Sequence, residues 1–187
     1  TDVLAFDTTN FDTHIATPTA GELAQRGKAK SERSDLRVVG LAVLVSETGH
    51  VPMLHRTYPG NGSDQSVLGD CLKALGQLHE ALDEGEQRPR GACRTLVRDG
   101  GSWSEQLELD LDIEGYGSLI SLPLSHNAAQ TALEQAARRG AMKRLGGNLG
   151  EVRAARMRAQ VGDLERTLVV VESQELLRGQ KRGIAVA

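Results

Sequence analysis

The sequence predicts a mixed α/β fold in which a sheet is flanked by helices. Before residue 60 the chain contains three short apolar runs and no helical periodicity, which indicates strands. After that point helix-like and strand-like segments alternate, and strands joined through helices add to a sheet in parallel. The composition is 39% hydrophobic, 25% charged and only 3% aromatic, so we expect a globular protein with an aliphatic core.

Three strands are predicted first. Residues 3–6 (VLAF) form an apolar run that ends at Asp7, as in a buried strand that delivers a carboxylate at its end. A polar loop over residues 13–33 follows, and its unusual length favours a functional or mobile role. Residues 36–46 and 51–58 are two further strands, and the short turn between them requires an antiparallel hairpin.

Helices and strands then alternate. The predicted elements are a helix from Ser63 or Asp64 to Leu82, a strand over 95–97, a helix capped by Ser102 or Ser104 and running to Leu111, a strand over 116–124, and an alanine-rich helix from Asn127 to Arg139 that stops at Gly140. In this order the first strand is central, and the strand after the first helix lies beside it. That is the layout of the ribonuclease H-like fold, a mixed sheet flanked by helices.

The composition of the sequence changes near Gly140. From there on glycine and arginine become frequent, and the alternation of helix-like and strand-like segments stops. We therefore predict a core over residues 1–140 and a separate appendage over 141–187, with a strand at 164–172 and the start of a helix at 174–180. The chain begins without methionine and ends inside an apolar run, so we interpret it as a fragment of a longer polypeptide.

Charge is unevenly distributed around a net charge of −3. Basic residues outnumber acidic ones between Arg138 and Arg182, and this asymmetry favours a polyanionic partner. The residues expected to contact DNA phosphates without sequence preference are Lys143, Arg144, Arg153, Arg156 and Arg158. The alternative interpretation is a solvated charged face.

Several classes of protein are disfavoured by the sequence. No apolar run is long enough for a membrane span, and no secretory signal opens the chain. The two cysteines, Cys71 and Cys93, are expected to be free thiols in a reducing compartment such as the cytoplasm. The five histidines lack the spacing of zinc ligands.

Two aspartates occupy corresponding places in the predicted sheet. Asp7 closes the first strand, and Asp99 closes the strand after the first helix. If these strands are parallel neighbours, both carboxylates emerge at one edge, where they repel each other unless a cation lies between them. Such oxygen ligands suit Mg²⁺, and a pair of these ions supports phosphodiester transfer. The alternative is that each aspartate only begins a turn, as the sequence Asp99-Gly100-Gly101 allows.

Three segments, in order, resemble the DDE-type insertion-sequence transposases. Residues 5–11 (AFDTTNF) are similar to the first catalytic block of that family. Residues 52–64, with Tyr58-Pro59-Gly60-Asn61 and then Asp64, resemble the segment that leads to its first helix. Residues 95–101 (TLVRDGG) resemble the second block. The weaker similarity of residues 169–180 is to a β-rich insertion found in one branch of the family.

The resemblance implies a ribonuclease H-like catalytic core that cleaves DNA and transfers strands with Mg²⁺ or Mn²⁺. It assigns metal ligation and catalysis to Asp7 and Asp99. It also implies a third acid, a glutamate on a late helix, which we expect outside this chain, although Glu172 and Glu175 lie at candidate positions. The implied partners are double-stranded DNA of the transposon ends and target, with a homodimer in the complex, at the nucleoid of a bacterial cytoplasm and without a membrane.

Two other functions stay open at this point. The chain could be a non-catalytic DNA-binding remnant that keeps the fold and the basic face, in which case no glutamate block follows in the gene. It could also be a ribonuclease H-like nuclease outside transposition, in which case cleavage occurs without strand transfer.

Overall fold

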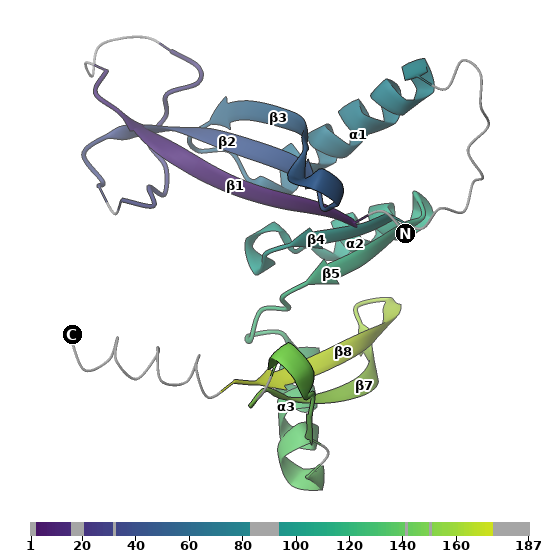
Figure 1. Cartoon of the computed structure of the whole chain (residues 1–187). Helices are drawn as coiled ribbons and strands as arrows, with labels where there is room; N and C mark the ends of the chain where they lie inside the picture. Colours follow the sequence, from purple (N-terminus) through teal and green to yellow (C-terminus); the bar gives the residue numbers. More distant parts are fainter. Residues whose placement is uncertain are drawn as a thin grey trace. The chain divides into compact units, whose positions relative to one another are not determined.

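A computed structural model describes residues 3–15, 21–31, 33–82, 94–140, 142–149 and 151–173 (Figure 1). The chain divides into two compact units, Thr1–Ser121 and Leu122–Ala187, called here the first and the second unit. Among the described residues, no helix combines the length and the apolar character that crossing a membrane requires.

The first unit is built on a five-stranded mixed sheet with the strand order β3-β2-β1-β4-β5. Its strands are β1 (Val3–Thr13), β2 (Arg37–Ser46), β3 (Pro52–Pro59), β4 (Arg94–Arg98) and β5 (Tyr116–Ile120). Strand β2 pairs antiparallel with β1 and with β3, whereas β4 pairs parallel with β1 and with β5. This topology confirms the predicted mixed α/β class and is compatible with a ribonuclease H-like fold.

Two helices lie among the described residues of the first unit, and they cover one face of its sheet. They are α1 (Asp64–Leu82) and α2 (Glu105–Ile113), and two short 3₁₀ turns, η1 (Thr48–His50) and η2 (Gly100–Ser102), lie in the connections. The Ser104 hydroxyl accepts a hydrogen bond from the Leu107 N–H at the start of α2, so this predicted cap is present.

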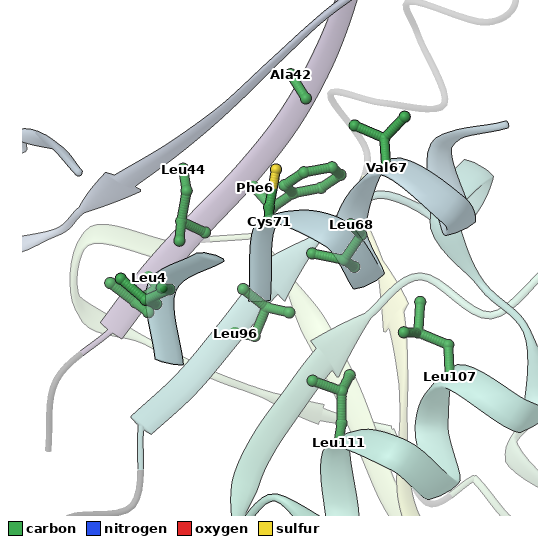
Figure 2. Packing of buried hydrophobic residues seen from close by; sticks show 11 residues of the cluster. Leu4, Phe6, Ala42, Leu44, Val67, Leu68, Cys71, Leu96, Leu107 and Leu111 are labelled. Carbon is green, nitrogen blue, oxygen red and sulfur yellow. The ribbon is translucent and has the colours of Figure 1, made fainter. Parts of the chain in front are cut away.

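Strands and helices of the first unit share an aliphatic core (Figure 2). The buried members are Leu4, Phe6, Ala42, Leu44, Val67, Leu68, Cys71, Leu75, Leu96, Leu107 and Leu111. Residues of the strands alternate in this set, as expected for a sheet with one helix-covered face. Cys71 is a buried free thiol whose pKa is raised by burial, and Cys93 lies outside the described residues.

Strand β1 is longer than its apolar run predicted. It extends to Thr13 because residues beyond Asp7 continue to pair with β2, ending with Thr13 opposite Arg37. These residues are mostly polar, so hydrophobic pattern alone could not reveal them. Strand β5 ends at Ile120, earlier than the predicted residue 124.

The second unit contains a helix and a separate antiparallel sheet. Helix α3 (Asn127–Arg139) ends at Gly140, which adopts the left-handed conformation with φ 53°. The sheet consists of β6 (Lys143–Arg144), β7 (Arg153–Val161) and β8 (Leu164–Glu172), with the 3₁₀ turn η3 (Gly147–Leu149) after β6. The described residues after Gly140 therefore form a sheet of their own and do not extend the five-stranded sheet.

The division between the units lies after Ser121, whereas the change in composition predicted it after residue 140. Helix α3 contacts β7 and β8 and belongs to the second unit. Its alanines Ala132 and Ala136 are buried, as is Ala155 of β7, so small side chains make this packing close. The helix predicted over residues 174–180 lies outside the described residues.

Candidate carboxylate site

The register of the sheet brings Asp7 and Asp99 to neighbouring strands at the same level. Strands β1 and β4 pair in parallel from Val3 opposite Thr95 to Phe6 opposite Arg98. Asp7 and Asp99 each follow the last of these paired residues. The structure thus brings the two predicted site positions together, while their part in catalysis and metal binding stays a prediction.

Each of the two carboxylates is oriented by the main chain that follows it. Asp7 is exposed, between the buried Phe6 and the half-buried Thr8, and its Oδ1 accepts a hydrogen bond of 2.8 Å from the Thr8 N–H. Asp99 caps the turn η2, where its Oδ1 accepts a hydrogen bond of 3.2 Å from the Gly101 N–H. These hydrogen bonds limit the rotation of both side chains without using a neighbouring cation.

A buried polar network supports the backbone at Asp99. The Arg98 guanidinium forms an ion pair with Glu108, and the two side chains are only 0% and 9% exposed. Arg98 also donates to the Ser102 carbonyl oxygen at 2.9 Å and to the Ser118 hydroxyl at 3.2 Å. The Ser102 hydroxyl in turn donates to the Asp99 carbonyl oxygen at 2.9 Å. The network joins β4, η2, α2 and β5, and so fixes the turn that carries Asp99.

Burial lowers the pKa of Arg98 to about 10, which leaves its guanidinium protonated at neutral pH. The positive charge required by the ion pair with Glu108 is therefore present under ordinary conditions. Sequence reasoning gave Arg98 no role, because a single arginine at the end of an apolar run usually lies at the surface.

A cleft of 690 Å³ opens beside Asp99 within the first unit, and we call it the Asp99 cleft. The residues that line it are Thr8, Thr9, Asn10, Gly27, Lys28, Ala29, Lys30, Gly40, Tyr58, Gly60, Asn61, Gly62, Ser63, Asp64, Asp99 and Gly101. It therefore combines two lysines with two aspartates on a surface rich in glycine.

The carboxylates of Asp64 and Asp99 both lie next to Gly101 in this cleft. A Cβ at Gly101 would lie 3.4 Å from Asp99 Oδ1 and 3.5 Å from Asp64 Oδ2. Asp64 begins α1, and its Oδ1 accepts a hydrogen bond of 3.0 Å from the Tyr58 hydroxyl. The sequence indicated Asp64 as a helix start and as part of a family-like segment, but not as a neighbour of Asp99.

Tyr58 is the residue that positions Asp64. Burial, followed by the hydrogen bond to Asp64, raises the pKa of Tyr58 to about 12, so its hydroxyl stays a donor at neutral pH. The tyrosine ring lies against Gly40 of β2, where a Cβ would be 2.3 Å from Tyr58 Cζ. The absence of a side chain at Gly40 is what makes room for the ring.

The polar loop after β1 is attached to the cleft by several hydrogen bonds. Asn10 Nδ2 donates to the Lys28 carbonyl oxygen at 2.8 Å, and the Lys30 N–H donates to Asn10 Oδ1 at 3.0 Å. Lys30 Nζ donates to the Thr8 carbonyl oxygen at 2.6 Å. A Cβ at Gly27 would lie 1.8 Å from the Gly60 carbonyl oxygen, so two backbones meet closely here. The described part of the loop thus has a defined place in the first unit.

Two carboxylates from β1 and β4 are the metal donors that the resemblance assigned within the first unit. Among the described residues, no group of three or more His, Cys, Asp and Glu side chains is arranged to hold a metal ion. Glu172 lies at the end of β8 in the second unit and forms an ion pair with Arg153, and Glu175 lies outside the described residues. A third acid outside this chain stays a prediction.

The basic residues predicted to contact DNA are largely paired with glutamates of the same unit. Their ion pairs, all at exposed side chains or nearly so, are Arg144–Glu151, Arg153–Glu172 and Arg158–Glu165. For Lys143 and Arg156, the described residues include no such partner. The excess of positive charge that the sequence indicated is therefore reduced locally, and Arg156, opposite Val169 in the sheet, is the more available arginine.

The first unit is a five-stranded mixed sheet with two aspartates in register on its central parallel strands. No family model and no curated protein matches the sequence. A search of solved structures finds similarity to a chain in the cryo-EM structure of a piggyBac transposase synaptic complex with hairpin DNA, at 14% sequence identity and a TM-score of 0.42. The similarity covers 90% of this chain and 32% of that chain, so this chain spans about a third of its length.

Proposed function

We propose that this chain is the N-terminal part of a transposase catalytic domain, which cleaves phosphodiesters in DNA and joins the freed strand to a target. The observation that carries the proposal is the parallel register of β1 and β4, which places Asp7 and Asp99 side by side after Phe6 and Arg98. The motifs around both aspartates resemble those of the DDE-type transposases, and the strand order is compatible with the fold of that family.

The donor chemistry of the two aspartates fits Mg²⁺ or Mn²⁺. Mg²⁺ keeps several waters and takes one or two carboxylates from a protein, and Asp7 and Asp99 offer two. When bound, such ions stabilise the charge on a transferring phosphoryl group and on the attacking oxygen. The third ligand of the family is a glutamate that we expect outside this chain, so this chain alone is expected to bind metal weakly and to lack activity.

The chain's own residues hold and orient the two carboxylates. The N–H groups of Thr8 and Gly101 fix the rotation of Asp7 and Asp99. The buried pair of Arg98 and Glu108 keeps the turn after β4 in place. Positioning of this kind reduces the reorganisation that the transition state requires.

Metal binding by the purified chain tests the proposal. Mn²⁺ is titrated into the protein, and the free ion is followed by its electron paramagnetic resonance signal. We expect Asp7→Asn and Asp99→Asn each to weaken Mn²⁺ binding at least tenfold, a difference of about 1.4 kcal/mol. The matched control is Asp163→Asn, an exposed aspartate in the β7–β8 turn of the second unit, which should bind Mn²⁺ like the wild type.

Two outcomes would contradict the proposal. If Asp7→Asn and Asp99→Asn bind Mn²⁺ as the control does, the two aspartates are not metal ligands, and a non-catalytic DNA-binding remnant is the better description. If a longer form of the protein cleaves DNA without strand transfer, the nuclease alternative replaces transposition.

A further inference from the structure

The loop over residues 21–31 brings Lys28 and Lys30 into the Asp99 cleft, and the proposed metal chemistry does not use either of them. Lys30 Nζ donates to the Thr8 carbonyl oxygen, which places one ammonium against the main chain of β1, one residue from Asp7. Lys28 is exposed, and among the described residues its ammonium has no ion-pair partner. Two lysines therefore line the same cleft as the carboxylates of Asp64 and Asp99.

The shape of the loop shows that this arrangement is built into the fold. A Cβ at Gly60 would lie 2.1 Å from the Val38 carbonyl oxygen, so the main chain of the β3–α1 turn lies directly on β2. The Gly60 N–H donates to the Leu23 carbonyl oxygen at 3.2 Å, and Gln25 exchanges two backbone hydrogen bonds with Val38. The loop is thereby attached to β2 and to the β3–α1 turn through residues that directly precede the lysines.

We propose that the Asp99 cleft binds a phosphate of a single DNA strand through Lys28 and Lys30 and presents the end of that strand to Asp99. The proposal rests on the proposed function of Asp99. Ammonium groups hold phosphate as point charges. Asp64 and Asp99 accept hydrogen bonds only, so they suit a sugar hydroxyl and repel a second phosphate.

The size of the cleft favours a single strand over a duplex. Its volume of 690 Å³ is that of a site for a small ligand, which matches a nucleotide-sized piece of a strand. A phosphate on the lysines leaves the neighbouring terminal hydroxyl on the side of the aspartates.

The test uses fluorescence anisotropy of a short labelled single strand with the whole chain, at several salt concentrations and with divalent cations removed. We expect Lys28→Gln to weaken binding roughly fivefold to tenfold at low salt and to flatten the log–log salt slope by about 0.7, the value for one phosphate contact on a single strand. The matched control is Lys73→Gln, an exposed lysine on α1 that should leave affinity and slope unchanged.

A second measurement locates the binding. In nitrogen–proton correlation spectra, a 5′-phosphorylated dinucleotide should shift the amides of Gly60, Gly62 and Gly101, and Lys28→Gln should reduce these shifts. Arg156→Ala, in the second unit, should not affect them. This measurement separates the cleft from phosphate contacts elsewhere in the chain, and thermal unfolding of each variant verifies that the fold is retained.

The proposal is overturned if Lys28→Gln and Lys73→Gln bind the strand alike, if duplex DNA competes as well as the single strand, or if a free nucleoside monophosphate binds as tightly as the strand. The last result would assign the cleft to free nucleotides. Because these titrations contain no metal ion, they can fail while Asp7 and Asp99 still bind Mn²⁺, and the two proposals are therefore tested separately.

Discussion

Removing one partner of the buried ion pair between Arg98 and Glu108 should strongly destabilise the first unit. In Glu108→Ala the Arg98 guanidinium stays at 0% exposure without its counter-charge. Breaking such a pair costs about 3–5 kcal/mol, because an uncompensated charge is left in a medium of low polarity. That is a large part of the total stability of roughly 5–15 kcal/mol expected for a domain.

The double variant Arg98→Met/Glu108→Leu should be far less damaging than either single change. Hydrophobic side chains of similar volume that replace both ions together avoid the desolvation cost, so the double variant is expected within about 1–2 kcal/mol of the wild type. The hydrogen bonds from Arg98 to Ser102 and Ser118 are lost as well, which opposes full recovery. The coupling energy of the cycle should therefore be several kcal/mol.

Urea denaturation followed by the fluorescence of Trp103 is the suitable assay. Trp103 is the chain's single tryptophan and directly follows η2, where its carbonyl oxygen accepts a hydrogen bond of 2.7 Å from Gln65. The control is Asp70→Ala, which breaks the exposed 3.9 Å pair with Arg56 and should cost under about 1 kcal/mol. Two results would refute this. The first is that Glu108→Ala loses no more unfolding free energy than Asp70→Ala at an unchanged m-value. The second is that the double variant is as unstable as the less stable of its two single variants.

Three further results are expected. In a Tyr116→Phe background, alkaline absorbance titration should show Tyr58 ionising near pH 12, and Asp64→Asn should lower the pKa of Tyr58. Because folding raises this pKa above its ordinary value of 10, the stabilising contribution of the Tyr58 hydroxyl is complete below pH 10 and is lost as the pH rises towards 12. Gly60→Ala should lower the unfolding free energy by about 1–3 kcal/mol because its Cβ meets backbone, whereas the control Gly69→Ala in α1, where nothing lies within 4 Å, should raise it by up to about 1 kcal/mol; equal effects would contradict this. Arg156→Ala should flatten the salt dependence of duplex DNA binding by about 0.9, and Arg153→Ala by less because Glu172 already pairs with Arg153; identical slopes would refute the difference.

The sequence alone determined most of the element order and the mixed class of the fold. Periodicity and capping residues act over a few positions, so α3 was predicted with its exact bounds, from Asn127 to Arg139 with Gly140 as its stop. The parallel pairing of β1 with β4 also followed, because a helix between two strands allows that connection. The placement of Asp7 and Asp99 in register is a consequence of that topology.

Tertiary structure decided the rest, since it depends on contacts between residues far apart in the chain. Packing of small side chains assigned α3 to the second unit, although composition changes only after Gly140. The pairing of β7 with β8 brings Arg153 next to Glu172, so the positive charge of Arg153 is partly neutralised. The sequence analysis had counted this charge as available to DNA. The close approach of glycine backbones brought Lys28 to the cleft that holds Asp99. No local sequence pattern encodes such an approach, because the role of a glycine in a close backbone contact depends on a segment that lies far away in the sequence.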